Sequence, residues 1–480
     1  MSGFTLSGTT LKDRQHDALV DVELQRKVRN GVDRFASRKA EALAQLGLSF
    51  EDGTTAGADG VRDAARAMRA RTIARLPQIL ERFADNLLAN GVHVHWAANG
   101  DEANEAIVAI AQRIGAKRVV KGKSMATEET ALNEALATVG AEVVETDLGE
   151  WIIQLDHDVP SHIIAPALHL DRNDIKRIFD THAGADDVSN EPEELNRFAR
   201  KVLRQKFLTA DLGISGCNLA IAETGSILLV ENEGNGRMCT TLPRVHVAVM
   251  GMERIVETWA DANLVVNLLG RSGTGQPLTS YTNIITGPRR PHDADGPDEV
   301  HVVILDNGRS SLLGTEFEEM LNCIRCGACL NVCPVYRQTG GHAYGWVYSG
   351  PMGAVLTPLL AGKENPEAAE VANASTLCGA CHDACPVGIP LQDLLLAARR
   401  LRVSQSASRS ERAAWAAWAS MWSHRRTYEL SMKGAGIGGS LLGARVGALP
   451  GAKEWAIGRS MPTAATDSFR SRWRKGEVEK

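Results

Sequence analysis

Cysteines recur at fixed spacing in Cys323-Ile324-Arg325-Cys326-Gly327-Ala328-Cys329-Leu330-Asn331-Val332-Cys333-Pro334. The spacing is C-x2-C-x2-C-x3-C-P, which is typical of loops that hold iron–sulfur clusters, because each iron of a cubane cluster needs one thiolate. A second run repeats the pattern without its first cysteine: Cys378-Gly379-Ala380-Cys381-His382-Asp383-Ala384-Cys385-Pro386. The two runs contain seven of the nine cysteines of the chain, and they predict an iron–sulfur protein.

Two other roles for these cysteines fit the sequence less well. Zinc sites favour two C-x2-C pairs that form one tetrahedral set, and the run of four cysteines before a proline departs from that arrangement. Disulfides are typical of secreted chains, whereas residues 1–21 are polar and lack an apolar segment of signal-peptide length. We therefore expect a cytoplasmic location, where reduced thiols are available for cluster assembly.

The order of the cysteines predicts which of them share a cluster. In two-cluster ferredoxins the cysteine before proline binds the cluster of the other run. This rule gives cluster one four thiolates and leaves cluster two with three. The predicted ligands are Cys323, Cys326, Cys329 and Cys385 for cluster one, and Cys333, Cys378 and Cys381 for cluster two.

Ser375 stands where the second run lacks a cysteine. Three outcomes are open: a three-iron (3Fe-4S) cluster, a four-iron (4Fe-4S) cluster with one labile iron, or an oxygen ligand from Ser375. A hydroxyl is a much poorer ligand than a thiolate, because it loses its proton far less easily. The simplest interpretation is that Ser375 caps a turn or helix near the cluster.

Length and composition limit the class of protein. A chain of 480 residues predicts two or three domains. The net charge of −5 indicates no general affinity for nucleic acid, and this argues against a cluster-containing nucleic-acid enzyme. No stretch approaches the roughly 18 apolar residues of a membrane span, so no transmembrane segment is expected.

The periodicity of apolar residues predicts an α/β body between two helical regions. Helical spacing prevails from Arg14 to Leu88, and from Gly91 to about Leu313 strands alternate with helices, which predicts βαβ units and a mostly parallel sheet. The expected helices are 102–114 and 128–139. The expected strands are 92–96, 118–120, 142–145, 218–222, 226–230, 245–250 and 302–305.

The C-terminal part, after the largely helical cluster region of residues 317–400, contains two further patterns. Trp415, Trp418 and Trp422 share one helical face, for which core packing is the first interpretation and docking to a partner subunit the second. The stretch 434–439 matches G-x-G-x-x-G, but it follows a helical segment and no βαβ unit surrounds it. We therefore expect no nucleotide site there.

Polar, glycine-rich loops at the ends of predicted strands are candidates for a ligand pocket. Helix capping and turn formation explain many of these residues, but Lys121 and Lys123 are not needed for capping and could face an anion. The remaining cysteines, Cys217 and Cys239, are expected to be buried thiols. The candidate pocket residues are Lys123, Glu223, Thr224, Gly225, Asn232, Glu233, Asn235, Gly275 and Gln276.

Several of these stretches together resemble the lactate utilisation protein B (LutB) family. The markers are residues 123–129, 145–150, 160–163, 222–226, 232–235 and 274–276, followed by the two cysteine runs. The resemblance implies an α/β LUD domain of the NagB/RpiA/CoA-transferase-like type, an α-helical ferredoxin-type module with two 4Fe-4S clusters, and a helical tail. The implied division is 1–90 for N-terminal helices packed on the LUD domain, 91–313 for the LUD domain, 314–400 for the ferredoxin-type domain and 401–480 for the tail.

The resemblance also implies a function and partners. The function would be electron transfer in the oxidation of L-lactate to pyruvate, together with a LutA-like CCG-domain protein and a LutC-like LUD protein, between donor and acceptor proteins. The sequence offers no flavin or nicotinamide site, so we expect a partner to perform the first chemical step. Two alternatives stay open: another 2-hydroxy acid such as glycolate, or a ligand-binding LUD module whose clusters are structural.

Overall fold

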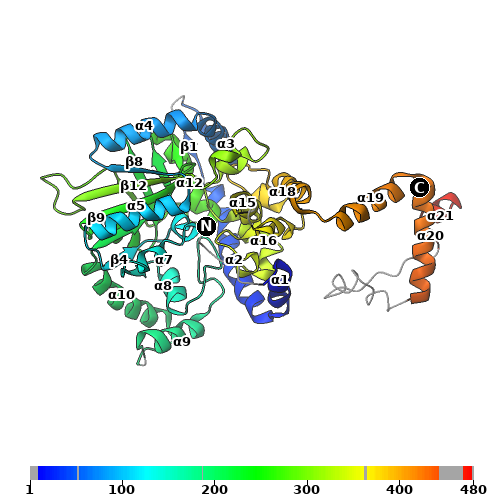
Figure 1. Ribbon diagram of the computed structural model, residues 1–480, viewed down its shortest axis with the longest axis horizontal. Coiled ribbons are helices and arrows are strands. Elements are labelled where there is room, and N and C mark those ends of the chain that lie inside the picture. Colours follow the sequence, from blue (N-terminus) through cyan, green and yellow to red (C-terminus); the bar gives the residue numbers. More distant parts are fainter. Residues whose placement is uncertain are drawn as a thin grey trace. The chain divides into compact units, whose positions relative to one another are not determined.

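The computed structural model describes residues 9–50, 53–185, 187–361, 365–442, 467 and 469–477. It divides into two compact units, Met1–Arg402 and Val403–Lys480. The first unit contains the sheets and both cysteine runs (Figure 1).

A six-stranded sheet forms the centre of the first unit, and all its neighbouring strands are parallel. The strand order is β3-β12-β9-β6-β4-β5. This confirms the expectation of an α/β body with a parallel sheet. The strands are β3 (His93–Ala97), β4 (Arg118–Lys121), β5 (Glu142–Glu145), β6 (Leu212–Ser215), β9 (Val245–Gly251) and β12 (Glu299–Leu305).

Helices cover both faces of this sheet, as parallel sheets require. One face packs its aliphatic residues against α5 (Gly100–Arg113) and α7 (Leu132–Ala137). Near β4 and β5 the other face is covered by α8 (Leu148–Leu155), α9 (Arg172–Ala183), α10 (Pro192–Leu208) and α11 (Asn235–Thr241), whose core includes Trp151 and Phe179. Asn99 and Asp147 cap α5 and α8 by accepting hydrogen bonds from first-turn N–H groups.

A second sheet of four strands was not expected from the sequence as a separate sheet. Its order is β10-β7-β8-β11, with β7 and β10 parallel and the other pairs antiparallel. The strands are β7 (Leu219–Ile221), β8 (Ser226–Glu231), β10 (Ile255–Val256) and β11 (Tyr281–Ile285). The sequence analysis missed β6, β10 and β11, because β6 contains Gly213 and Ser215, β10 has two residues, and β11 is a largely exposed edge strand.

Two local expectations were wrong. The helix expected over 128–139 begins earlier and is interrupted: α6 (Met125–Glu129) ends before Ala131, whose φ of 52° breaks the helix ahead of α7. The stretch Arg271–Gln276, which contains the candidates Gly275 and Gln276, was expected at a strand end, but its first three residues belong to α12 (Trp259–Gly273). The apolar pattern of these segments did not distinguish a short helical pair from one helix, or a helix end from a strand end.

Helices from the N-terminal region lie against both the sheets and the cysteine-rich module. Helix α2 contacts α12, α13 (Ala328–Val332) and α14 (Tyr336–Thr339), while α3 contacts α12 and η2 (Glu318–Asn322). The N-terminal helices are α1 (Leu11–Val20), α2 (Val22–Ala44), α3 (Ala58–Ala74) and α4 (Leu76–Ala89), with a small hairpin of β1 (Leu48–Ser49) and β2 (Thr55–Ala56) between α2 and α3. The module contains η1 (Ser310–Leu312), η2 (Glu318–Asn322), α13 (Ala328–Val332), α14 (Tyr336–Thr339), η3 (His342–Tyr344), α15 (Gly350–Ala361), α16 (Pro366–Glu370), η4 (Val371–Asn373), α17 (Ala380–Ala384) and α18 (Leu391–Ser406).

The second unit contains α19 (Arg409–Ser423), α20 (Arg425–Leu442) and α21 (Phe469–Arg474). Trp415, Trp418 and Trp422 lie on α19 and are 46–59% exposed, so the first interpretation, core packing, was wrong. Their rings contact one another instead, with centroids 5.7 and 5.2 Å apart. The G-x-G-x-x-G stretch lies inside α20, which agrees with the expectation that it is not a dinucleotide-binding turn.

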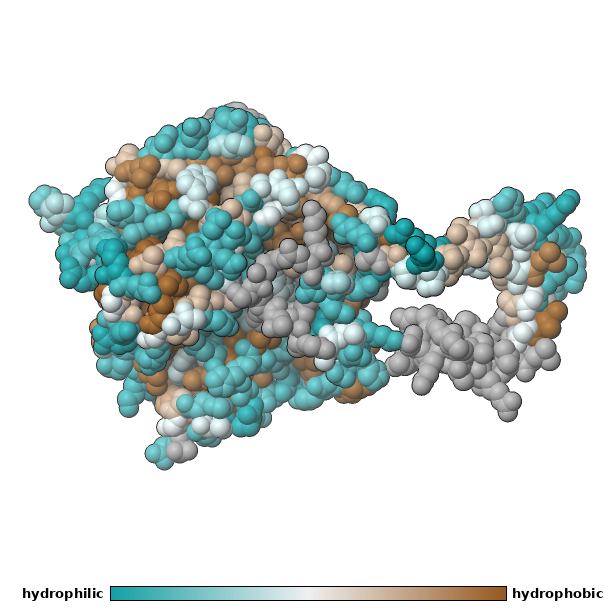
Figure 2. All heavy atoms as spheres, in the orientation of Figure 1, coloured by the Kyte–Doolittle hydropathy of each residue, from teal (hydrophilic) through white to brown (hydrophobic). Residues whose placement is uncertain are grey.

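Among the described residues, no helix combines the length and the apolar character needed to cross a membrane. Figure 2 shows hydrophilic residues over most of the visible face of the first unit, with hydrophobic patches between them. Such single patches are normal, because much of the surface of any folded protein is apolar.

A buried network of charged side chains joins the parallel sheet to the cysteine-rich module. Both guanidinium Nη atoms of Arg309 lie 2.8 Å from the Glu129 carboxylate, and its Nε lies 2.8 Å from Glu253 Oε2. Glu253 Oε1 in turn lies 3.0 Å from Arg325 Nη2, and Tyr348 donates a hydrogen bond to Glu129. Because Arg325 and Tyr348 belong to the module, the network fixes the module on the sheet.

We expect Glu253→Gln to lower the free energy of unfolding by about 3 kcal/mol or more, because it leaves buried arginines without a counter-charge. Burial alone would raise the pKa of Glu253, but Arg309, Arg325 and Arg254 outweigh it and hold this pKa at about 2. Denaturant unfolding of anaerobically purified protein measures the loss.

The matched control is Glu316→Gln, which removes the partner of Arg400 in an exposed ion pair. Its cost should stay below about 1 kcal/mol, as for most surface pairs. Equal losses from the two variants would show that the buried network stabilises the protein no more than a surface pair does.

Candidate metal centres and adjoining pocket

The two cysteine runs fold in the same way. Arg325 directly precedes Cys326, and Leu377 directly precedes Cys378, the equivalent cysteine of the second run. These two residues have φ values of 57° and 56°. Gly327 and Gly379 then have φ values of 75° and 85°, a left-handed conformation that glycine adopts without strain. Helices α13 and α17 follow these glycines, and each ends at the cysteine before proline.

Four cysteines face one small cavity of about 20 Å³. Cys323, Cys326 and Cys329 come from the first run and Cys385 from the second, which is the grouping expected for cluster one. Aliphatic side chains such as Ile324 form much of the remaining lining. All nine cysteines are free, so these thiols do not form disulfides.

The chemistry of this group of thiols fits a metal cluster. Burial raises the pKa of Cys326 to about 12 and also raises that of Cys385, so both thiols keep their protons unless a cation replaces them. Lys39 places an ammonium group near Cys326, Cys329 and Cys385; burial lowers its pKa and the nearby sulfurs oppose this effect. A site that groups four sulfurs beside a cation suits an iron–sulfur cluster of net negative charge.

The second group of cysteines is more open to solvent. Cys333 and Cys381 are buried, whereas Cys378 is exposed. The three sulfurs are close enough to interact. Cys378 helps to raise the pKa of Cys333, and Cys333 and Cys378 help to raise the pKa of Cys381, in addition to the larger effect of burial. Hydrogen bonds from the Ala380 N–H and from Thr376 lower the pKa of Cys378.

Ser375 occupies the place that Cys323 takes in the first run. The Arg325 N–H donates a hydrogen bond to Cys323 Sγ at 3.4 Å, and the Leu377 N–H donates to Ser375 Oγ at 3.1 Å. Ser375 therefore caps a turn beside the second group, as the simplest interpretation expected. The same geometry puts its hydroxyl at the position of the missing sulfur.

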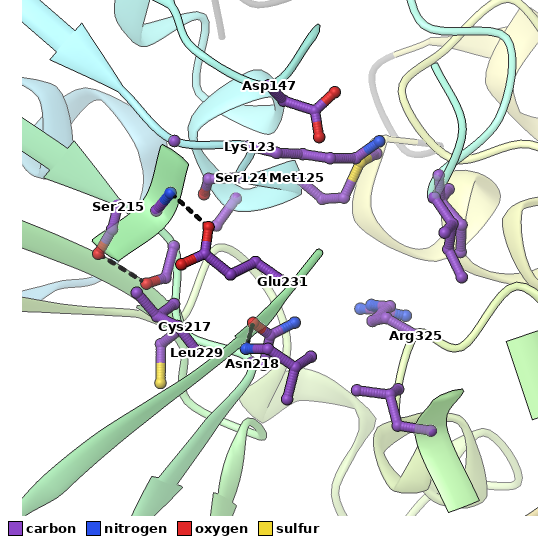
Figure 3. A pocket seen from close by; sticks show the side chains of 18 of the residues that line it. Lys123, Ser124, Met125, Asp147, Ser215, Cys217, Asn218, Leu229, Glu231 and Arg325 are labelled. Atoms are coloured by element: carbon purple, nitrogen blue, oxygen red, sulfur yellow. Dashed lines mark hydrogen bonds between the residues drawn. The ribbon is translucent and has the colours of Figure 1, made fainter. Parts of the chain in front are cut away.

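A cavity of about 300 Å³ lies at the carboxyl edge of the parallel sheet. Residues that follow or end β4, β5, β6, β9 and β12 line it, because the carboxyl ends of parallel strands meet at one edge. Arg325 and Tyr348 of the cysteine-rich module complete the wall, as Figure 3 shows for Arg325. The cavity thus lies between the α/β body and the loop of the first cysteine run.

The structure brings five of the nine candidate pocket residues to this cavity: Lys123, Asn232, Glu233, Asn235 and Gln276. Gly275 is next to Gln276 but does not line it. The segment 223–225 lies elsewhere, at the turn between β7 and β8, where Gly225 packs against Asn86 of α4. Residues 223–225 were candidates because they follow a predicted strand. That strand, β7, belongs to the second sheet, so they do not lie at the carboxyl edge of the parallel sheet.

The two lysines after β4 differ in their environment. Lys121 is fully buried and its Nζ lies 2.7 Å from Glu128 and 2.8 Å from Glu145, so it does not face an external anion. Lys123 lines the cavity, and its Nζ has no hydrogen-bond partner among the described residues. Glu150 is 3.4 Å from this nitrogen.

Sequence reasoning missed the charged residues on the module side of the cavity. Arg325 stands inside the first cysteine run, and Glu253 and Arg254 lie two and three residues after the end of β9. Arg254 Nη1 donates to the backbone oxygen of Cys323 at 3.0 Å. A charged residue between two cysteines was a signal that could have identified Arg325, but nothing in the sequence showed that it meets the end of β9.

The cysteine-rich loop approaches the body through a glycine. A Cβ atom at Gly273 would lie 2.4 Å from the carbonyl oxygen of Cys326, closer than any side chain allows.

Cys217, expected to be buried, instead lines the cavity and is partly exposed, while Cys239 is buried as expected.

Comparison with protein-family models finds three matches along the chain. The LUD domain matches residues 80–305, the 4Fe-4S dicluster domain matches residues 319–389, and the C-terminal domain of lactate utilisation protein B matches residues 401–478. The dicluster match covers the two cysteine runs.

Relatives match over almost the whole chain. "Lactate utilization protein B" of Shouchella clausii is 45% identical over 99% of this chain and 98% of its own length. The protein of the same name from Bacillus licheniformis is 50% identical over 81% of this chain and 79% of its own. The "uncharacterized electron transport protein YkgF" of Escherichia coli is 40% identical over 98% of both. Among solved structures, a DUF162 family protein from Deinococcus radiodurans matches with 19% identity, a TM-score of 0.28 and coverage of 48% of this chain and 98% of that one.

Glu150 should make the stability of the protein depend on pH. Burial raises the pKa of Glu150 from 4.5 to about 8. Between these values the folded chain holds a proton that the unfolded chain has lost, so this contribution to stability is full below pH 4.5 and is lost as the pH rises to about 8. We therefore expect Glu150→Gln to be more stable than the wild type by at least about 1 kcal/mol near pH 8.5, and nearly equal to it near pH 5.

Denaturant unfolding at both pH values measures this difference. Glu142→Gln, at an exposed carboxyl group, is the control and should change stability by less than about 1 kcal/mol at either pH. A Glu150→Gln variant that follows the wild type at both pH values would contradict the assignment of a buried, protonated carboxyl group.

Proposed function

Because the chain belongs to the lactate utilisation protein B family, we propose that it is the iron–sulfur electron-transfer subunit of an L-lactate oxidation system. The chain is an iron–sulfur protein of lactate utilisation. The observation that carries the finer proposal is the pair of equivalent cysteine loops in one helical module. The name of the Escherichia coli relative, an electron transport protein, supports the same role.

The cavity that Cys323, Cys326, Cys329 and Cys385 share supports the proposed ligand sets. Cys323, Cys326, Cys329 and Cys385 hold cluster one, and Cys333, Cys378 and Cys381 hold cluster two, with Ser375 at its fourth position. A bound iron–sulfur cluster accepts and releases single electrons. The two electrons released when lactate becomes pyruvate could therefore leave one at a time.

The chain's own groups adjust these centres. Backbone N–H groups of Arg325, Tyr336 and Ile389 donate hydrogen bonds to Cys323, Cys333 and Cys385. Such bonds stabilise the more negative, reduced form of a bound cluster and would therefore raise its reduction potential. Lys39 adds a positive charge near cluster one. Burial of the first group excludes water, while the exposed Cys378 lies where a protein partner could approach the second.

The partners proposed for electron donation and acceptance are a LutA-like CCG-domain protein and a LutC-like LUD protein, in the cytoplasm. We assign the first chemical step, removal of hydrogen from the hydroxy acid, to a partner. For the α/β body we propose a NagB/RpiA/CoA-transferase-like relationship, which the parallel sheet with a cavity at its carboxyl edge supports.

The test is EPR spectroscopy with iron and sulfide counts on anaerobically purified protein, before and after addition of partner proteins and L-lactate. We expect cluster signals that L-lactate reduces in the presence of the partners. The same experiment with glycolate in place of L-lactate shows which of the two acids reduces the clusters. Clusters that no 2-hydroxy acid reduces would favour a binding module with structural clusters.

Replacing one proposed ligand of cluster one should remove iron from that cluster, whereas replacing a cysteine outside the ligand sets should not. Cys326→Ala is expected to lose most of the iron of cluster one, whereas Cys239→Ala, at a buried cysteine near Thr146, should keep the wild-type iron content. Circular dichroism checks that both variants fold. A Cys326→Ala protein with full iron content would contradict the ligand assignment.

Ser375→Cys tests the fourth position of cluster two. Since the Ser375 hydroxyl lies at the place of a cluster sulfur, a thiol there should hold a fourth iron more firmly. We expect mild oxidation to produce a three-iron EPR signal in the wild type and a much weaker one in Ser375→Cys. An equal three-iron signal in both proteins would show that position 375 does not face cluster two.

A further inference from the structure

The cavity at the carboxyl edge of the parallel sheet is large enough for a small metabolite. Its volume is about 300 Å³, at the lower end of the range for small-molecule sites. Its walls come from two parts of the first unit, the strand ends of the α/β body and the loop of the first cysteine run. The proposed electron-transfer function uses none of these wall residues apart from that loop.

Two cationic side chains offer hydrogen-bond donors to this cavity. Lys123 Nζ has no hydrogen-bond partner among the described residues, and its nearest carboxyl oxygen is Glu150 Oε1 at 3.4 Å. Arg325 uses Nη2 for Glu253, while Nη1 meets only the thioether of Met352 at 3.4 Å, a weak acceptor. Figure 3 shows Lys123 and Arg325 reaching the cavity from different elements, the loop after β4 and the cysteine-rich module.

The acidic residues of the lining already have partners: Glu253 is ion-paired with Arg309 and Arg325, and the other three accept hydrogen bonds, mostly from backbone N–H groups. Glu231 accepts hydrogen bonds from the N–H groups of Gly236 and Arg237, and from Asn283. Glu233 accepts from the Leu148 N–H. The carboxylate of Asp147 caps α8. The donors that stay available are therefore cationic, and they favour a ligand with a carboxylate or similar anionic group.

Neutral polar groups complete the recognition surface. Asn218, Asn232 and Gln276 line the cavity with amide groups. The amides of Asn232 and Gln276 hydrogen-bond each other, and Asn218 Oδ1 accepts from the Val230 N–H, so the Asn218 amide nitrogen is the group placed to donate to a hydroxyl or keto oxygen. Aliphatic residues such as Leu229, Val230 and Leu269 supply a small apolar wall. A carboxylate with an adjacent oxygen and a short carbon skeleton matches this combination.

The cavity also adjoins the first group of cysteines. Ile163 and Arg325 line both the 300 Å³ cavity and the small cavity that the four cysteines face. Arg325 stands between Cys323 and Cys326 in the chain, and Arg254, another lining residue, bonds the Cys323 backbone. A ligand paired with Arg325 would therefore lie next to the proposed cluster one.

We propose that this cavity binds a small 2-hydroxy or 2-oxo carboxylate, with its carboxylate between Lys123 and Arg325 and its second oxygen toward the amide side chains. The choice of these acids rests on the proposed function, whereas the preference for a carboxylate rests on the cavity. Binding there places substrate or product beside cluster one and couples occupancy of the cavity to the environment of that cluster.

Anaerobic isothermal titration calorimetry of the full, cluster-containing chain tests the proposal. L-lactate and pyruvate should bind in the range below about 10 mM, and propane-1,2-diol, which lacks the carboxylate, should not. Inorganic phosphate distinguishes a general anion site from a carboxylate site. Lactate or pyruvate should also shift the EPR signal of reduced cluster one.

The variant Lys123→Met should weaken lactate binding about tenfold or more, because it removes a charge-assisted hydrogen bond. The matched control is Lys117→Met, at an exposed lysine, which should bind lactate as the wild type does. Arg325→Lys serves as a second variant, with its iron count measured in parallel because Arg325 adjoins cluster ligands.

The outcomes separate this proposal from the proposed function. No binding of either acid, equal binding of propane-1,2-diol or phosphate, or equal affinity of Lys123→Met and Lys117→Met would overturn the carboxylate site. Lactate-dependent cluster reduction with partners could still occur in those cases, and the proposed function would stand. Binding as expected without any such reduction would overturn the proposed function and leave the carboxylate site in place.

Discussion

The buried chain of charges Glu129–Arg309–Glu253–Arg325 is the constraint on which the arrangement of the first unit depends. Each of these groups is too costly to bury alone, so the four are stable only when the end of β9, the loop after β12 and the first cysteine run are assembled together. The docking of the module is thereby tied to the folding of the sheet. Tyr348 and Arg325, whose guanidinium lies 4.9 Å from the tyrosine ring centre, strengthen the same junction.

This junction also determines where the cavity and the cysteines lie relative to each other. The carboxyl edge of the parallel sheet forms a ligand-sized space, and the module covers it with the loop that holds three of the cysteines. The contact between Gly273 and the Cys326 carbonyl needs a residue without a Cβ, so α12 and the loop meet backbone to backbone. The cavity and the first group of cysteines therefore share part of one wall, which includes Ile163 and Arg325.

The parts of the molecule that sequence predicted are those governed by local rules. Cysteine spacing, which cluster binding requires, predicted that Cys385 groups with the first run, although it lies 52 positions after Cys333. Alternation of strands and helices predicted the parallel sheet. The separate antiparallel sheet, the broken helix at Ala131 and the exposure of Trp415 depend on tertiary contacts that no local pattern contains. The same is true of the pairing of Arg325 with Glu253, 72 residues earlier in the chain.

The exposure of Cys378 has a practical consequence for anyone who handles the protein. A thiol that is open to solvent and has a lowered pKa reacts with alkylating reagents faster than thiols that are buried with raised pKa values, such as Cys326 and Cys385. As a proposed ligand of cluster two, that sulfur would be engaged, and so protected, when iron is bound. Brief iodoacetamide treatment followed by peptide mass spectrometry would therefore report, residue by residue, how much of a preparation has lost its metal to air.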